Sequence, residues 1–453
     1  MTRCITYLII LGLVLAFLDE SLRKLIPGNP VAVTAVKDVL FCLAGLGAVL
    51  ADDRDLNRYM IRFVPWTMLT SLSALYVWSS LGSVSLLAAS LRTYTLSPLL
   101  FAVGYRVGRD SGLLKASVRI FIGFGIIAVT IAFLQEHARE SLPEVFSARI
   151  YFEKHAESGG SYVESLFASP QTLGQLAVLM ATWCFAQVLF GAGVSKTLLV
   201  SLSLIPLLYT IYVCRIRSAF LLVSLAVFAE CALAIAYQGV TWRLLKFTLV
   251  GAVLALVLLG LASQLASTKD SMTEAATEKD VEYFGSMFTA DELFERLSQF
   301  TIEYDLLRNH NFLLGYGAGT GSLVTQFDLP NLSPDIPQVT DTGLFLIYHE
   351  YGSVGLACFA SAYLSISMML VGRLCKTHVV SIPLIASGVL SSVFLVWFLF
   401  KSYTVMRNGF SHAMWLGSMG LFCGLIGGPD ERRVPVKGEG EARCGGAPRP
   451  STE

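Results

Sequence analysis

The sequence contains little charge. Only 15% of its 453 residues are charged, whereas soluble globular proteins carry about 25%. The hydrophobic residues make up 54% of the chain and form long runs, each able to cross a hydrocarbon core of about 30 Å as a helix of about 20 residues. The mean hydropathy is +0.63. The scarcity of charge therefore excludes a soluble globular protein and predicts an all-α polytopic membrane protein.

Other absences narrow the chemistry. None of the nine cysteines forms a CxxC pair, which argues against a disulfide framework or a zinc site. The acidic residues of segment 266–341 include no DxD pair, so we expect a solvated acidic face and no metal ion. The first apolar run ends in "AFLDE" without a small-residue cleavage site, so it predicts a membrane span and not a cleaved signal peptide.

The apolar runs predict about twelve spans. They lie near residues 4–18, 31–51, 62–82, 92–108, 116–136, 170–191, 196–214, 218–238, 244–265, 342–372, 379–400 and 410–428. In the fourth span, Ser97 and Pro98 should kink the helix or make it re-entrant, because proline cannot donate a backbone hydrogen bond.

Lysines and arginines predict the orientation of these spans. They gather in four short loops, at Arg54, Arg58 and Arg62; Arg106, Arg109, Lys115 and Arg119; Arg243 and Lys246; and Arg373 and Lys376. With both termini in the cytoplasm all four loops lie inside, as basic loops prefer. Four basic residues, Arg23, Lys24, Lys401 and Arg407, then lie outside as a minority.

The polar segments define the organisation of the chain. Spans one to nine occupy 1–265, with a short outer loop at 137–169, and the remaining spans occupy 342–428. Between them lies a large extracytoplasmic loop, 266–341, in which Leu293, Leu297 and Phe300 predict an amphipathic helix by their spacing. The tail, 429–453, consists of Gly, Pro and charge and is predicted to be disordered in the cytoplasm.

Three arginines on the predicted outer side are candidates for a functional site. Arg215 and Arg217 connect the seventh and eighth spans, and Arg296 lies in the amphipathic helix. A guanidinium fork suits a phosphate or diphosphate. Two simpler interpretations stay open: Arg215 and Arg217 anchor helix ends in headgroups, and Arg296 pairs with Glu292 along its helix.

Polar residues near the tenth and sixth spans complete the candidate site. Asp341, at the outer mouth of the tenth span, could act as a general base, and His349 and Glu350 lie about 12–14 Å deeper. Glu350 lies on the opposite helix face from Asp341 at about 100° per residue, so a shared site needs a kink. Gly352 and Gly355 could supply this kink, or they could allow close helix packing. A buried structural role explains Glu350 equally. Gln171, which begins the sixth span, could project into an outer cavity or belong to an ordinary helix start.

The stretch "LLGYGAGTGS", residues 313–322, resembles loops that bind nucleotide phosphates. It follows a predicted helix and not a strand, however, and it lies outside the cytoplasm, where no ATP pool exists. Two interpretations remain open. Gly317 and Gly319 line a diphosphate site through bare N–H groups, or the glycines only permit a tight turn.

These elements, in this order, resemble the O-antigen ligase and polymerase superfamily of bacterial inner membranes. The resemblance covers about residues 160–360 and rests on four elements, "FASPQTLGQLA", "IRSAFLL", "ERLSQFTIEYDLLRNHNFLLGYGAG" and "DTGLFLIYHEYGSVGL". The second element resembles the family's "SRxxxL", which places a key arginine at Arg217, and the third places another at Arg296. The fourth resembles "HNxxLxxxxExGxxGL", with Glu350, Gly352 and Gly355 in register.

Two positions depart from the ligase pattern. Asp341 stands where ligases carry histidine, and Thr342 stands where they carry asparagine. Polymerases often carry aspartate at the first position, so the resemblance favours a polymerase. The alternatives are a ligase that moves glycan to lipid A core or to protein, and a transporter or flippase. A transporter predicts charges at mid-bilayer, for which Lys37, Asp38, Glu230 and Glu350 are the few candidates.

The resemblance implies a C-type glycosyltransferase architecture that acts on an undecaprenyl-diphosphate-linked glycan. Arg217 and Arg296, with Arg215, would stabilise the diphosphate leaving group, and Asp341 would orient or deprotonate the acceptor hydroxyl. The expected substrate contacts are Gln171, Gly317, Gly319, His349 and Glu350. The implied partners are the lipid bilayer, a chain-length regulator and a flippase, with no nucleic acid, and the active site would face the periplasm.

Overall fold

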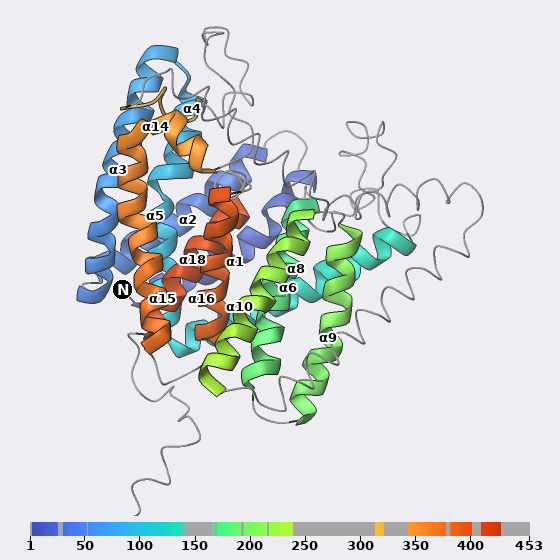
Figure 1. The fold of residues 1–453 in the computed structure, drawn as a ribbon. Helices are drawn as coiled ribbons and strands as arrows, with labels where there is room; N and C mark the ends of the chain where they lie inside the picture. Colours follow the sequence, from blue (N-terminus) through green and yellow to red (C-terminus); the bar gives the residue numbers. More distant parts are fainter. Residues whose placement is uncertain are drawn as a thin grey trace, which may run out of the picture.

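The computed structural model describes residues 2–25, 30–51, 53–138, 142, 165, 167, 170–191, 194–214, 217–238, 313–320, 343–376, 381–400 and 409–426. Within these ranges every regular element is a helix (Figure 1). The first half contains α1 (Thr2–Leu25), α2 (Pro30–Leu50), α3 (Arg54–Leu81), α4 (Val84–Ser90), the π-helix η1 (Leu91–Thr95), α5 (Ser97–Arg109) and α6 (Ser111–His137). The second half contains α8 (Pro170–Phe190), α9 (Val194–Val213), α10 (Arg217–Gln238), α14 (Gly343–Phe359), the π-helix η6 (Ala360–Leu364), α15 (Ser365–Lys376), α16 (Ile382–Phe400) and α18 (Gly409–Ile426).

The all-helical class predicted from the apolar runs is confirmed. Five stretches are long and apolar enough to cross a membrane, namely Leu86–Arg109, Ser111–His137, Pro170–Phe190, Ala219–Tyr237 and Gly343–Gly372. A helix also occupies every other predicted span except 244–265, which lies outside the described residues. The count of about twelve spans stays a prediction. So do the disordered tail and the amphipathic helix around Arg296, which lie outside the described residues.

The fourth predicted span breaks where proline requires it. Pro98 lies in the first turn of α5, and the five residues of η1 come directly before. The N–H of Leu96 reaches back five residues to the carbonyl of Leu91 (3.1 Å), a wider turn of the kind that often marks functional sites. The predicted kink is therefore confirmed, and the helical stretch around it is long enough to cross the membrane.

An aromatic cluster joins α3 to the α14 and η6 segment. The ring of Trp66 lies edge-on to Tyr351, Phe359 and Tyr363, at centroid distances of 5.3, 5.6 and 5.9 Å. The rings of Tyr94 and Tyr351 are 5.3 Å apart in the same geometry. Edge-on pairs add about 0.5–1.5 kcal/mol each beyond burial. The cluster therefore holds α14 against α3 and η1, where the candidate site lies.

Helices α5 and α18 approach each other closely through glycines. A Cβ on Gly104 would lie 2.1 Å from the carbonyl oxygen of Gly417, and a Cβ on Gly420 would lie 2.0 Å from that of Phe101. Only residues without side chains permit this separation, the small-residue packing that membrane helices use. The glycines therefore determine how closely α18 packs against α5.

Ion pairs join α1, α2 and η1. Lys37 pairs with Asp19, and both side chains are almost fully buried. Arg92 on η1 pairs with Asp38 at 2.5 Å. Two of the charges that a transporter could use are thus bound to neighbouring helices. Glu230 is also fully buried, and neither of its carboxylate oxygens has a hydrogen-bond partner within the described part of the chain.

We expect Lys37→Met to lower the thermal unfolding temperature of the detergent-purified protein, because it leaves the Asp19 carboxylate buried and uncompensated. Breaking one partner of a buried pair costs about 3–5 kcal/mol. The double variant Asp19→Asn/Lys37→Met should recover most of the loss. Lys115→Met, an exposed lysine on α6, is the matched control. An equal loss in the single and double variants would show that the pair is not the cause.

Candidate functional site

The glycine-rich residues 313–320 form a compact turn against α14. The N–H of Tyr316 donates to the carbonyl of His349 (2.8 Å), and the N–H of Gly317 donates to that of Glu350 (2.9 Å). In return, the N–H of Val354 donates to the carbonyl of Leu313 (3.2 Å). In an unbroken helix Val354 would donate to the carbonyl of Glu350. The turn therefore takes over hydrogen bonds that α14 gives up.

Helix α14 gives up these bonds because it is broken at Gly352. This residue has φ +63° and ψ −161°, a combination that is essentially restricted to glycine. A Cβ on Gly352 would lie 2.3 Å from the carbonyl oxygen of Leu313, and a Cβ on Gly315 would lie 2.5 Å from that of His349. Of the two glycines that could supply a kink, Gly352 is the one at which α14 breaks. Backbone freed by a broken span is tolerated where protein satisfies it, and here the turn does so.

The other side of the turn rests on α3 and α4. The N–H of Ala318 donates to Ser73 Oγ (2.8 Å), and Ser90 Oγ donates to the carbonyl of Ala318 (3.3 Å). A Cβ on Gly317 would lie 2.2 Å from a methyl carbon of Val77. Gly315, Gly317 and Gly319 all have positive φ, which other residues rarely adopt. The alternating glycines are thus needed to fit the turn between α14 and α3.

These contacts engage the backbone N–H of Gly317, and a substrate contact of this residue stays a prediction. Its N–H, like those of Tyr316 and Ala318, donates to another part of the protein. The glycines therefore serve first to make the turn and to complete α14. A substrate contact of Gly319 stays a prediction.

Glu350 and His349 lie beneath the turn. Glu350 is fully buried and His349 is 1% exposed, and the ring of Tyr316 lies 4.8 Å from the ring of His349. Because the break at Gly352 follows Glu350, it does not rotate Glu350 relative to residues 343–349. A structural role for the backbone of Glu350 is thus established, and a substrate contact of its carboxylate stays a prediction.

The chain path brings the starts of α8 and α10 to the same end of the bundle as the turn. Helix α5 leads away from η1, and α6 returns to end at His137. There the side chain of Gln135 accepts a hydrogen bond from the N–H of Ser165 (2.6 Å), just before α8 begins. The ring of His137 also contacts the hydroxyl of Tyr209 near the end of α9 (2.6 Å), and α10 follows.

The predicted site residues divide accordingly. Arg217 is the first residue of α10 and Gln171 the second of α8, so both lie at the end of the bundle that carries the turn. Arg215, Arg296 and Asp341 lie outside the described residues. The hydrogen bonds of Ser73 and Ser90 to the turn could not be predicted, because single serines in apolar helices carry no distinctive pattern.

Part of the chain is similar to a known protein family. Residues 180–360 match a family model described as O-antigen ligase. The match includes Arg217, the glycine turn and α14. A search of curated proteins finds no match.

Proposed function

We propose that the chain is an inner-membrane polymerase of the O-antigen ligase and polymerase superfamily, because residues 180–360 match a family model described as O-antigen ligase. It joins undecaprenyl-diphosphate-linked oligosaccharide repeat units into exopolysaccharide or O-antigen. The family is one of glycosyl-transferring enzymes, and together with the apolar helices it indicates a bacterial inner-membrane protein. The polymerase activity, the lipid-linked substrate and the orientation in the membrane are part of the proposal.

One observation carries the proposal: the glycine turn and the break in α14 form a single unit. Two stretches that carry the resemblance, "LLGYGAG" and "EYGSVGL", lie more than 30 residues apart in the sequence. Even so, Gly317 pairs with Glu350, and Val354 with Leu313, through their backbones. The segment that carries Arg296 enters this turn, and the segment that carries Asp341 leads into α14. We infer that this unit brings Arg296 and Asp341 together near the start of α14.

The proposed reaction is a glycosyl transfer at the anomeric carbon of the sugar that is linked to the lipid diphosphate. The acceptor hydroxyl oxygen bonds to the anomeric carbon, while the bond from that carbon to the diphosphate oxygen breaks. Asp341 takes the hydroxyl proton. Arg217 and Arg296, with Arg215, stabilise the charge that develops on the departing lipid diphosphate. Because the glycosyl diphosphate is already activated, the reaction needs no nucleotide or other cofactor.

Orientation follows from the distribution of arginines. The N-terminal end of α3 and the C-terminal end of α5 carry Arg54, Arg58, Arg62, Arg106 and Arg109. Ser73 and Val77, further along α3, contact the glycine turn. The positive-inside rule then puts the arginine-rich end in the cytoplasm. The turn and active site would face the periplasm, both termini would be cytoplasmic, and a flippase would deliver the repeat units, with a chain-length regulator as a further partner.

Two alternatives remain distinguishable from the polymerase. A ligase would transfer finished glycan to lipid A core or to protein, and Asp341 in place of histidine argues against it. A lipid-glycan flippase would need mobile charges within the bilayer. Lys37 and Asp38 are bound in ion pairs instead, which favours an enzyme.

Replacing Asp341, Arg217 and Arg296 one at a time should lower polymer synthesis about 100-fold, since removing one group that stabilises a transition state has effects of this size. The variants Asp341→Asn, Arg217→Gln and Arg296→Gln would be expressed in the native host, and the surface glycan would be separated on gels. Arg119→Gln, an exposed residue of α6, is the matched control.

The glycan pattern distinguishes the three functions. A polymerase defect leaves single repeat units displayed on the acceptor, a ligase defect leaves polymer on the carrier lipid, and a flippase defect leaves units inside the cell. Normal chain lengths in all three variants would overturn the site assignment.

A further inference from the structure

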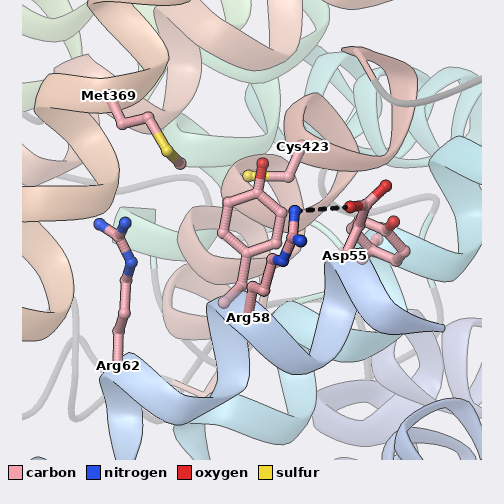
Figure 2. Close-up of a pocket in the computed structure, with 7 residues that line it drawn as sticks. Asp55, Arg58, Arg62, Met369 and Cys423 are labelled. Atoms are coloured by element: carbon pink, nitrogen blue, oxygen red, sulfur yellow. Dashed lines mark ion pairs between the residues drawn. The ribbon is translucent and has the colours of Figure 1, made fainter. Parts of the chain in front are cut away.

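Two neighbouring cavities open at the end of α3 and α5 opposite the glycine turn. Their volumes are about 180 and 400 Å³, and both are lined by Tyr105. Figure 2 shows the smaller one, where Arg58 and Arg62 project from α3 and Met369 and Cys423 lie across from them. Helix α3 runs 19 residues from Arg54 to the turn contact Ser73, about 28 Å at 1.5 Å per residue. The cavities are therefore separate from the candidate active site.

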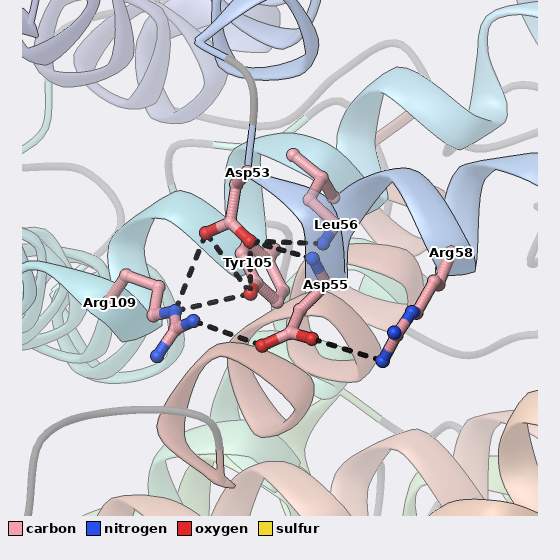
Figure 3. Close-up of polar contacts among 6 residues, drawn as sticks. All are labelled: Asp53, Asp55, Leu56, Arg58, Tyr105 and Arg109. Atoms are coloured by element: carbon pink, nitrogen blue, oxygen red, sulfur yellow. Dashed lines mark hydrogen bonds and ion pairs between the residues drawn. The ribbon is translucent and has the colours of Figure 1, made fainter.

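Positive charge dominates the lining of these cavities. It contains five arginines, Arg54, Arg58, Arg62, Arg106 and Arg109, and two aspartates, Asp53 and Asp55. Figure 3 shows how the aspartates are used: Arg109 pairs with Asp53 at 3.5 Å and with Asp55 at 3.3 Å, and Arg58 pairs with Asp55 at 3.7 Å. Asp53 also accepts hydrogen bonds from the hydroxyl of Tyr105 and from the first N–H groups of α3. Both carboxylates are thus engaged already.

Arg54 and Arg106 are left without an acidic partner among the described residues, although both line the larger cavity. The Nε of Arg106 is buried and has no hydrogen-bond acceptor there. A buried donor without an acceptor destabilises the folded protein, and more so when it is charged. The cavity therefore presents two guanidinium groups that lack an anion.

Apolar groups complete the lining and its surroundings. Leu56 lines the larger cavity and Met369 the smaller one. Leu50 and Ile61, next in sequence to the lining residues Ala51 and Arg62, are 72% and 67% exposed. In a membrane protein such exposed side chains face lipid. The arginines thus lie where the lipid-facing surfaces of α2 and α3 meet an open, charged pocket.

We propose that these cavities bind the phosphate group of an anionic phospholipid. Arg54 and Arg106 bind the phosphate oxygens, and the acyl chains lie along Leu50 and Ile61. Basic pockets between membrane helices suit such headgroups, and a guanidinium binds phosphate through two parallel hydrogen bonds. A free phosphate ion would make the same contacts with the arginines, but it has no acyl chains to pack along Leu50 and Ile61. The site is independent of the proposed polymerase reaction, because it lies at the other end of the bundle.

Lipid binding to the full chain in detergent tests the proposal. Phosphatidylglycerol would be titrated into wild type, Arg54→Gln/Arg106→Gln and the control Lys115→Gln/Arg119→Gln. The control removes two positive charges from exposed positions on α6 that line neither cavity. Binding would be followed by native mass spectrometry and by the shift in thermal unfolding temperature. We expect the first variant to bind phosphatidylglycerol at least about 10-fold more weakly, because it loses charge-assisted hydrogen bonds to the phosphate. The control should match wild type.

Three outcomes would overturn the proposal. The two double variants could bind phosphatidylglycerol equally, phosphatidylcholine could bind wild type as tightly, or inorganic phosphate could stabilise wild type as much as phosphatidylglycerol does. The last would assign the site to a soluble anion. If the double variant does not fold, Arg54→Gln alone serves, because the Arg54 side chain is exposed. It should still weaken binding measurably relative to Arg119→Gln.

Discussion

Replacing Gly352 with alanine should abolish surface polymer and leave little folded protein. Alanine cannot adopt φ +63° with ψ −161° without a cost of about 1–3 kcal/mol. Its Cβ would also lie 2.3 Å from the carbonyl oxygen of Leu313, so the glycine turn would have to leave α14. Backbone groups of His349, Glu350 and Val354 would then lose their partners within the membrane, where each unsatisfied group costs several kcal/mol. Surface glycan gels and the unfolding temperature of the purified protein measure the effect.

Gly372→Ala provides the matched control for this substitution. Gly372 lies on α15, further along the same predicted span, and a Cβ there meets no atom within 4 Å. Alanine should be neutral or slightly stabilising at this position, because glycine weakens a helix. If Gly352→Ala and Gly372→Ala supported equal polymer, the break in α14 would not be needed for function.

The second large effect is expected at the contact between α5 and α18. Gly420→Ala would place a Cβ 2.0 Å from the carbonyl oxygen of Phe101, which forces the two backbones apart. The stacked rings of Tyr363 and Trp415, 5.3 Å apart, would lose their contact as α18 moves. We expect a protein that aggregates on size-exclusion chromatography in detergent or unfolds at a much lower temperature.

Gly417→Ala, three residues away on the same helix, tests whether the effect is specific. A Cβ on Gly417 meets no atom within 4 Å, so this variant should behave as wild type. Similar stability of the two variants would mean that α18 can shift on α5 without loss, and that the close approach of the helices is not required.

The local breaks in the helices were predictable because single residues cause them. Pro98 lacks an N–H, and the break falls directly before it in η1 and Leu96. Gly352 was one of two glycines that could kink the tenth span, and the break falls there. What single residues could not indicate is where the freed backbone groups find partners, because the glycine turn that satisfies α14 is distant in sequence.

The contacts of the glycine stretch could not be predicted for the same reason, because its partners are distant in sequence. Taken alone, "GYGAGTG" is compatible with bare N–H groups that face a diphosphate. The packed structure directs the N–H groups of Tyr316, Gly317 and Ala318 to His349, Glu350 and Ser73. Whether a glycine-rich turn binds an anion or another helix depends on its neighbours, and a pattern of residues does not contain them.

By itself, the sequence determined that this protein is a bundle of membrane helices. Scarce charge and apolar runs of about 20 residues indicate helices, in which every backbone group finds its partner within the segment. It also located the breaks at Pro98 and Gly352, because backbone geometry at these residues is a local property. Only the tertiary structure decided that the glycine turn completes α14, that Lys37 pairs with Asp19, and that Arg54 and Arg106 lack acidic partners within the described residues. Each of these depends on which helices lie side by side, and helix packing joins residues that no sequence spacing relates.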